Sequence, residues 1–105
     1  MKLYLNDISS AASRVRIALA LKQITVETIH VGILGERPEN RESDYLRLNP
    51  QGLVPALVTD EGTLLTQSIA IIEYLDELQP APPLLPQDLE QRALTRAVAI
   101  TVAAE

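Results

Sequence analysis

Two strand-like segments near the start of the chain are separated by a helix-like segment, and this order constrains the fold more than any other feature. Residues 2–5 form a short apolar run, and residues 25–31 alternate β-branched side chains as a strand does. Between them, residues 9–22 place apolar side chains at helical spacing. Strands that are joined through a whole helix run parallel, with a right-handed crossover. The sequence therefore predicts a βαβ unit and an α/β fold.

The predicted helix over 9–22 has a clear start and two distinct faces. Ser9 and Ser10 follow a break at Asn6-Asp7, and a serine at this place is a good N-cap. The apolar face, expected to pack in the core, comprises Val15, Ala18 and Leu19, and the aliphatic stem of Lys22 falls at the same spacing. A polar flank is marked by Arg14, Arg16 and Lys22.

A charged loop leads from the second strand to a short helix. The loop covers residues 32–42 and contains Gly35, a residue typical of turns. The helix is predicted over residues 44–48, and Ser43 can cap it. Pro50 ends it, because the residue before a proline is pushed out of the helical region.

A hairpin and a longer helix come next. Residues 52–59 and 63–66 are predicted as the two strands, with their turn at residues 60–62. Pro55 must lie at the start or the edge of its strand, since proline cannot donate to a ladder. The helix over residues 68–78 carries a wide apolar face.

The complete order is β-α-β, then α, then β-β-α, and it predicts a mixed four-stranded sheet with helices on both faces. We expect this domain to cover residues 1–79. A stiff proline-rich linker is predicted over residues 80–87, and a last helix over residues 88–105.

Composition excludes several classes of function. The sequence has no cysteine, which excludes disulfides, thiolate nucleophiles and cysteine–zinc sites, and its single histidine, His30, cannot form a metal cluster. The net charge of −5, without a basic stripe, argues against nucleic acid as a partner. No apolar run approaches the roughly 20 residues that span a bilayer. Because residues 1–7 turn polar too soon for a signal peptide, we expect a cytoplasmic protein.

The pair Gln67-Ser68 marks the point where a strand gives way to an apolar helix. With Ser68 as the cap, Ile71 stands where a capping box would have Glu or Gln, so the first-turn amides are free to bind an anion. Gln67 adds an amide that both donates and accepts. The pair predicts a carboxylate-binding site, although an ordinary serine cap is the simpler interpretation of Ser68 taken alone.

Two other segments carry similar signals. A cis Val54-Pro55 bond would leave the amide and carbonyl of Val54 free to pair with an extended peptide, and a plain strand-start proline is the alternative. Ser9 and Ser10 can donate to an anion or a thiolate at a helix start, and capping is again the alternative. In this order of elements, all three segments lie near one edge of the sheet, so we expect them to form one site.

Three segments resemble the N-terminal domain of the glutathione transferases, and most of all their zeta class, the maleylacetoacetate isomerases. They are SSAASRVRIALALK (9–22), LNPQGLVPALV (48–58) and TQSIAIIEYLDE (66–77), and PPLLPQD (82–88) resembles the linker of that class. The similarity extends over residues 1–105 almost throughout. It implies a thioredoxin-like fold, glutathione as a cosubstrate, a small electrophile as the second substrate, and a homodimer as a compatible assembly.

The resemblance also implies a role for each candidate residue. Ser9 and Ser10 would be the catalytic hydroxyls that contact the glutathione sulfur. Val54-Pro55 would pair with the cysteinyl backbone, and Gln67-Ser68 would hold the γ-glutamyl carboxylate. Asn40 occupies a loop position where members of the class can have a glutamine that touches the ligand. The implied glutathione-binding residues are Ser10, Asn40, Val54, Pro55, Gln67 and Ser68.

The chain departs from the class pattern at two kinds of position. Ala11 stands where the class has a cysteine and Ser13 where it has an aromatic residue, and only the first helix of a second, all-helical domain is present. We therefore predict the glutathione-binding domain of a zeta-like transferase or isomerase, weakly active or inactive as it stands. Its parental reaction would be glutathione addition to an electrophile or glutathione-dependent cis–trans isomerisation. The alternative is a non-catalytic interaction module.

Overall fold

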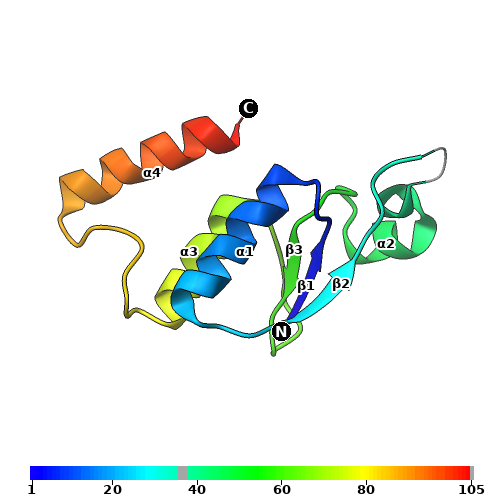
Figure 1. Cartoon of the computed structure of the whole chain (residues 1–105), viewed down its shortest axis with the longest axis horizontal. Coiled ribbons are helices and arrows are strands. Elements are labelled where there is room, and N and C mark those ends of the chain that lie inside the picture. The colour runs from blue at the N-terminus through cyan, green and yellow to red at the C-terminus, as the bar shows by residue number, and fades with distance from the viewer. Residues whose placement is uncertain (36–37, 105) are drawn as a thin grey trace.

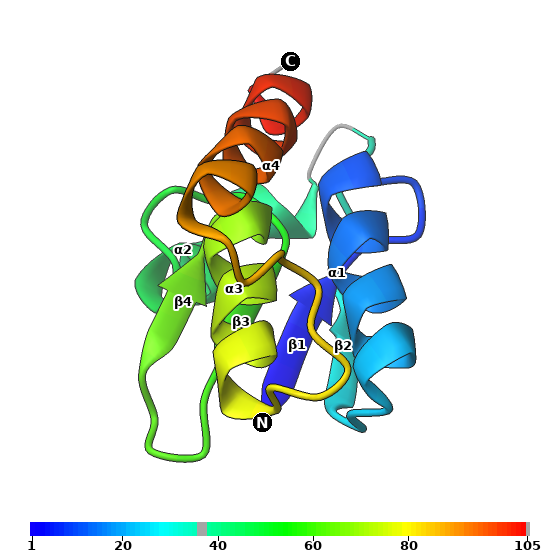
Figure 2. The ribbon, with the colours of Figure 1, turned by 90° about the vertical axis from the view of Figure 1, so that its left-hand side faces the viewer.

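The computed structural model describes residues 1–35 and 38–104, and it contains a four-stranded sheet with helices on both faces (Figure 1). The strands, in the order β2-β1-β3-β4 across the sheet, are β1 (Lys2–Leu5), β2 (Glu27–His30), β3 (Ala56–Val58) and β4 (Leu64–Thr66). The helices are α1 (Ser10–Lys22), the 3₁₀ turn η1 (Glu39–Arg41), α2 (Ser43–Leu48), α3 (Ser68–Leu78) and α4 (Leu89–Ala103). Figure 2 shows α1 and α3 side by side on one face of the sheet, α2 behind it, and α4 apart from both layers.

The strand pairing agrees with the predicted fold class. β1 and β2 are parallel, with Leu3 opposite Thr28, as the helical connection between them requires. β3 is antiparallel to both of its neighbours, so Leu57 lies opposite Leu3 on one side and Leu65 on the other. The predicted mixed sheet is confirmed.

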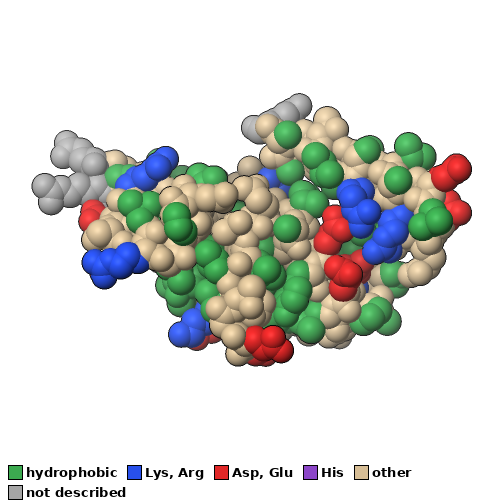
Figure 3. Space-filling model, turned by 180° about the vertical axis from the view of Figure 1, so that it is seen from behind, with side chains coloured by type: hydrophobic (Ala, Val, Ile, Leu, Met, Phe, Trp, Pro, Cys, Tyr) green, Lys and Arg blue, Asp and Glu red, His purple; other side chains and the backbone are tan. Residues whose placement is uncertain are grey.

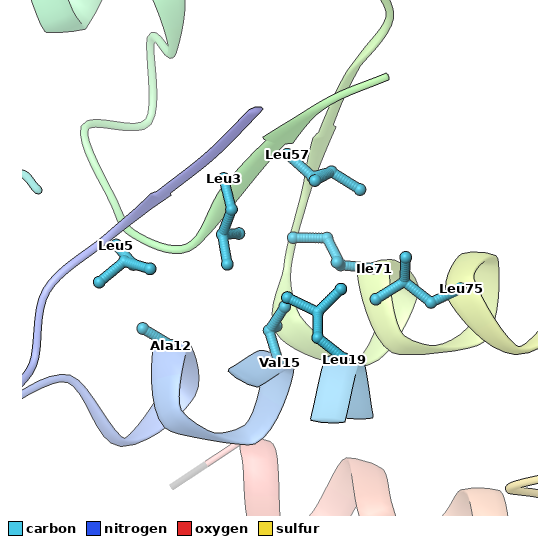
Figure 4. Packing of buried hydrophobic residues seen from close by; sticks show 8 residues of the cluster. All are labelled: Leu3, Leu5, Ala12, Val15, Leu19, Leu57, Ile71 and Leu75. Carbon is cyan, nitrogen blue, oxygen red and sulfur yellow. The ribbon is translucent and has the colours of Figure 1, made fainter. Parts of the chain in front are cut away.

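The hydrophobic core lies between the sheet and the helix pair α1 and α3. Side chains alternate between the faces of a strand, so Leu3 and Leu5 both point toward the helices (Figure 4). The buried members of the cluster are Leu3, Leu5, Ala12, Val15, Leu19, Leu57, Ile71 and Leu75. All of them are aliphatic in a sequence that has no Phe or Trp, and burying each large side chain stabilises the fold by about 1.5–3 kcal/mol.

The opposite face of β1 packs against α2. Tyr4 alternates with the core leucines, and its ring centroid lies 5.9 Å from that of Tyr45 in α2. The Tyr45 hydroxyl donates a hydrogen bond of 2.6 Å to the carbonyl oxygen of Leu53. Burial raises the pKa of Tyr45, so the phenol stays neutral and keeps the proton that it donates. This contact fastens the loop before β3 to the sheet.

One of the predicted helix N-caps is confirmed, and two others are wrong. Ser9 is the N-cap of α1, and its Oγ accepts a hydrogen bond of 3.1 Å from the Ala12 amide. The prediction that Ser68 caps α3 is wrong by one residue, because the backbone at Gln67 takes a left-handed φ of 71° that turns the chain from β4 directly into the helix. Similarly, Ser43 does not cap α2 but is its first residue.

The prediction that Lys22 belongs to a polar flank is wrong, whereas its position at the apolar spacing agrees with its burial. Its side chain is fully buried, and its Nζ donates to the carbonyl oxygens of Gln79 at 2.6 Å and Pro82 at 2.5 Å and pairs with Asp76 Oδ1 at 2.5 Å. A buried ammonium is tolerated where acceptors satisfy its three donors. Here the acceptors come from the end of α3 and the linker, so helical spacing within α1 could not reveal them.

The first strand covers the predicted residues 2–5, whereas the other three predicted strands are longer than the observed ones. β2 covers Glu27–His30 within the predicted 25–31, and β4 begins at Leu64. The largest difference is at β3, which begins only at Ala56 because the chain before it is an irregular loop with a left-handed glycine, Gly52, at a φ of 66°.

The last helix, α4, covers Leu89–Ala103 within the predicted residues 88–105. Asp88 is the N-cap of α4, and its Oδ2 accepts a hydrogen bond of 3.0 Å from the Gln91 amide. Residues 36 and 37 of the predicted loop and Glu105 of the predicted last helix lie outside the described residues. No helix in the described part of the chain is both long and apolar enough to cross a membrane.

Candidate ligand-binding site

A pocket of about 480 Å³ opens where segments far apart in the sequence meet beneath the end of α4. Val54 and Pro55 line it from the loop before β3, and Thr66, Gln67 and Ser68 line it from the junction of β4 and α3. Two of the three predicted segments therefore meet in one pocket. The third segment, the start of α1, contributes other residues than those predicted.

The junction of β4 and α3 offers unpaired backbone donors to the pocket. The first hydrogen bond within α3 runs from the Ile71 amide to the Gln67 carbonyl at 3.0 Å, so the amides of Ser68, Ile69 and Ala70 precede it. Gln67 forms no side-chain cap, and Ser68 is almost fully buried at 5% exposure. The free amides at the positive end of the helix dipole can bind an anion.

The loop before β3 is held in shape by a buried asparagine. Asn49 donates from Nδ2 to the Leu53 carbonyl at 2.9 Å and accepts at Oδ1 from the Gln51 amide at 3.1 Å. The loop leads into Val54-Pro55, whose peptide bond is cis. Val54 lies outside β3 and lines the pocket, so its backbone is not part of the strand pairing.

The start of α1 places the two predicted serines at the margin of the site. Ser9 Oγ is engaged with the Ala12 amide, and Ser10 is exposed as the first residue of the helix. Neither serine lines the pocket, whereas Ala11 and Arg14 from the same helix do. Arg14 reaches α3, where its Nε donates to Ser68 Oγ at 3.4 Å.

Asn40 lies apart from the pocket. Its side chain is buried, and Nδ2 donates to the carbonyl oxygen of Gly52 at 2.8 Å, on the far side of the loop that carries Val54. Its Oδ1 is buried without a hydrogen-bond partner among the described residues. In this structure Asn40 supports the loop rather than facing the space that the other candidates line.

The last wall of the pocket comes from the end of α4 and the residue after it, through Ile100, Ala103 and Ala104. The helix is tied to the rest of the chain by Arg96, which makes a two-pronged ion pair with Glu73 of α3 at 2.6–3.1 Å. Figure 3 shows acidic and basic side chains gathered beside one another on this side of the molecule, below α4. No three His, Asp or Glu residues in the described ranges are grouped to hold a metal ion.

Residues 8–78, well over half of the chain, match the sequence family described as the glutathione S-transferase N-terminal domain. The chain belongs to the glutathione S-transferase family. It is 52% identical over 102 residues to the maleylacetoacetate isomerase of Pseudomonas aeruginosa, covering 97% of this chain and 48% of that protein. It is 51% identical over 94 residues to glutathione S-transferase Z1 of Arabidopsis thaliana, covering 90% of this chain and 41% of that protein.

Solved structures of zeta-class transferases have the same fold. A maleylacetoacetate isomerase from Anaeromyxobacter dehalogenans, with glutathione bound in its active site, is 42% identical and superposes with a TM-score of 0.80 over 98% of this chain and 48% of that one. The holo structure of a bacterial zeta-class maleylpyruvate isomerase is 43% identical, with a TM-score of 0.85 over 94% of this chain and 45% of that one. The predicted thioredoxin-like transferase fold is confirmed, and the chain spans about half the length of these relatives.

Several residues of this transferase domain that line the pocket were not among the predicted ones. Asn49 could have been found from the run Asn49-Pro50-Gln51-Gly52, since asparagine before such a turn accepts from the amide two residues on. Arg14 and Ile100 carried no such local signal. Their neighbours in the pocket come from other elements, and helical periodicity assigns them only to a polar or an apolar face.

Proposed function

We propose that this chain is the glutathione-binding domain of a zeta-like glutathione transferase or maleylacetoacetate isomerase. The observation that carries the proposal is the single pocket shared by the Val54-Pro55 loop and the uncapped start of α3 at Gln67-Ser68. A peptide backbone needs an unpaired strand-like edge, and a carboxylate needs convergent N–H and O–H donors. The strand-like edge at Val54 and the donors at Gln67-Ser68 line the same pocket, so one peptide ligand could contact both. Family membership and the relatives with bound glutathione support the same ligand.

In this proposal each group of residues recognises one part of the tripeptide. Gln67, Ser68 and the first-turn amides of α3 bind the γ-glutamyl carboxylate. The Val54 backbone pairs with the cysteinyl residue, which directs the sulfur toward the start of α1. There Ser9 and Ser10 donate hydrogen bonds to the sulfur, and the positive end of the helix dipole favours its thiolate form. Asn40 acts indirectly, through the loop that it supports.

The proposed chemistry begins with the glutathione thiolate. In a transferase reaction the sulfur lone pair forms a bond to an electrophilic carbon, while a leaving group departs with its bonding pair or the π pair of an activated double bond moves onto the adjacent carbonyl as an enolate. In an isomerase reaction the carbon–sulfur bond breaks again after rotation about the former double bond, as the enolate pair restores the double bond and the sulfur leaves as the thiolate. The second substrate would be a small electrophile, and a homodimer is compatible with the family. Ala11 lines the pocket where zeta enzymes have a cysteine. We therefore expect the loss of this cysteine to reduce isomerase activity more than glutathione binding.

Isothermal titration of the folded 105-residue chain with glutathione tests the proposal. Ser68→Ala and Gln67→Ala should each weaken binding by about tenfold, because a hydrogen bond to a charged group contributes about 1.5–3 kcal/mol. Ser43→Ala is the matched control, since this serine is exposed on α2 and does not line the pocket. Absence of glutathione binding by a sample with a cooperative unfolding transition would overturn the proposal.

A non-catalytic interaction module is the second candidate, and the exposed side chains of α4 favour it. Leu89, Leu94 and Val98 on this helix are each more than 60% exposed. Conjugation of glutathione to a generic electrophile, together with the mass of the protein in solution, separates the two candidates. Conjugation above the uncatalysed rate supports the enzyme, whereas an inactive but associated protein supports the module.

A further inference from the structure

Arg14 differs from the two other cations of α1 in having no carboxylate partner. Arg16 and Lys22 each lie within 4 Å of an Asp oxygen. Among residues 1–35 and 38–104, no Asp or Glu oxygen lies within that distance of Arg14, although its side chain is partly buried in the pocket wall. A partly buried guanidinium without a counter-ion pays a desolvation cost that an anionic ligand would offset.

The hydrogen bond between Arg14 and Ser68 determines what the serine hydroxyl can do. Arg14 Nε–H donates to Ser68 Oγ at 3.4 Å, so one lone pair of that oxygen is already occupied. A serine hydroxyl has a single proton to donate, and among the described residues Ser68 donates it to no protein acceptor. Ser68 is 5% exposed, so the pocket is the space that remains for that proton.

We propose that Arg14 is a positioning residue for the carboxylate end of the ligand, because it orients the Ser68 hydroxyl as a donor toward the pocket and supplies the positive charge behind it. The inference rests on the proposed function, in which Ser68 binds the γ-glutamyl carboxylate of glutathione. It adds a third element, from α1, to a subsite otherwise built from the β4–α3 junction. It also states a specificity: Arg14 matters for a ligand that carries this carboxylate and not for one that lacks it.

A comparison of two ligands on two proteins tests this inference. The ligands are glutathione and 4-aminobutyryl-cysteinyl-glycine, in which the γ-glutamyl α-carboxylate is replaced by hydrogen. The 105-residue wild-type chain should bind the second peptide at least about tenfold more weakly than it binds glutathione. For Arg14→Gln, glutathione binding should weaken by about tenfold, while binding of the peptide without the carboxylate should change by less than about twofold.

Two further variants separate positioning from a general loss of structure. Arg14→Lys keeps the charge but not the planar Nε–H donor, so it should recover part of the discrimination between the two ligands. Arg47→Gln is the matched control, because Arg47 is an exposed arginine on α2 that pairs with Asp44 and does not line the pocket. This control should leave both affinities within about twofold of the wild type. Thermal unfolding of each variant establishes that it is folded.

The possible results are distinct. If Arg14→Gln weakens both ligands equally, Arg14 has only a structural role and the inference is wrong. If it weakens neither, Ser68 does not need Arg14 and the inference is again wrong, while the proposed function stands. If folded wild-type protein binds neither ligand, the proposed function fails first and the inference fails with it. Should Arg14→Gln not fold, equal losses for both ligands in Arg14→Lys overturn the inference in the same way.

Discussion

At the scale of single residues, the shape of the loop before β3 depends on the side chain of Asn49 and on the absence of a side chain at Gly52. Asn49 closes the loop with both ends of its buried side chain. Gly52 follows at a φ of 66°, and a Cβ there would lie 3.0 Å from the Asn40 carbonyl oxygen and 3.0 Å from Leu46 Cδ2. The loop carries Val54 and Pro55 into the pocket, so its shape decides where a ligand backbone could lie.

Gly52→Ala should destabilise the protein by more than Gly62→Ala does. Both glycines have positive φ, at 66° and 88°, so both substitutions cost about 1 kcal/mol of backbone strain. Only at Gly52 does the new methyl group also meet neighbouring atoms, whereas a Cβ at Gly62 meets open space. We expect a difference of about 1 kcal/mol or more in the free energy of unfolding in urea. Equal losses for the two variants would contradict this account of the loop.

At the scale of elements, the buried Lys22 joins the C-terminal ends of α1 and α3 to the linker. Its ammonium group meets Asp76 of α3 and the carbonyls of Gln79 and Pro82. Asp76 Oδ1 also accepts from the Leu84 amide at 2.8 Å, and Gln79 Nε2 donates back to the Lys22 carbonyl. The path of the linker from α3 to α4 is therefore fixed by a polar cluster beside an otherwise aliphatic core.

Lys22→Met should lower the free energy of unfolding by about 3 kcal/mol, because it leaves a buried carboxylate and two carbonyls without their donor. Cleavage of the linker by a protease at low concentration should also become faster. The control is Arg16→Met, which breaks an exposed ion pair with Asp7 and should cost less than about 1 kcal/mol. If both variants are equally stable, the Lys22 cluster does not hold the linker.

The same cluster predicts a dependence on pH. Burial opposes ionisation of Asp76, but the hydrogen bonds from Lys22 and the Leu84 amide outweigh it, so the pKa of Asp76 lies below its usual value. A carboxyl with a lowered pKa in the folded state stabilises the fold fully above its unfolded pKa of about 4, and this stabilisation is lost as the pH falls through the folded value. Asp76→Asn should therefore be less stable than wild type at pH 7, with a difference that shrinks toward pH 2. Urea titrations across this range would measure it, and a constant difference would argue against the ion pair.

At the scale of the whole molecule, α4 is the part that is least attached. Figures 1 and 2 show it beyond the two layers, at the end of the linker. Among its contacts are the Arg96–Glu73 ion pair, a hydrogen bond from Arg92 to the Pro86 carbonyl, and the residues at its end that form a wall of the pocket. The site and the position of α4 are consequently linked, although the core does not depend on this helix.

Arg96→Ala should leave global stability within about 1 kcal/mol of the wild type, because the ion pair that it breaks is partly exposed to solvent. Amide hydrogen exchange in residues 89–103 should nevertheless become faster, since little else fastens the helix. Exchange in α1 serves as the internal reference and should not change. Unaltered exchange in α4 would mean that apolar contacts, and not Arg96, hold it in place.

The sequence alone determined the features that depend on near neighbours. The strand, helix and strand at the start, the Ser9 cap and the presence of a last helix after the linker all follow from periodicity and capping, which act over three or four residues. For the same reason, the Gln67-Ser68 pair was recognisable as the start of a helix with unpaired amides. The N-cap was predicted one residue too late, at Ser68, because nothing in the neighbouring sequence indicates the positive φ of Gln67.

The tertiary structure decided which polar side chains are buried and what they touch. Lys22 and its acceptors are 57 and 60 residues apart, and Arg14 and Ser68 are 54 apart. The local pattern assigns Arg14, Arg16 and Lys22 to the same polar flank of α1. In the folded chain Lys22 is buried, Arg16 is exposed to solvent, and Arg14 lines the pocket. The physical reason is that the free energy of burying a charge depends on partners that only the packed elements bring together.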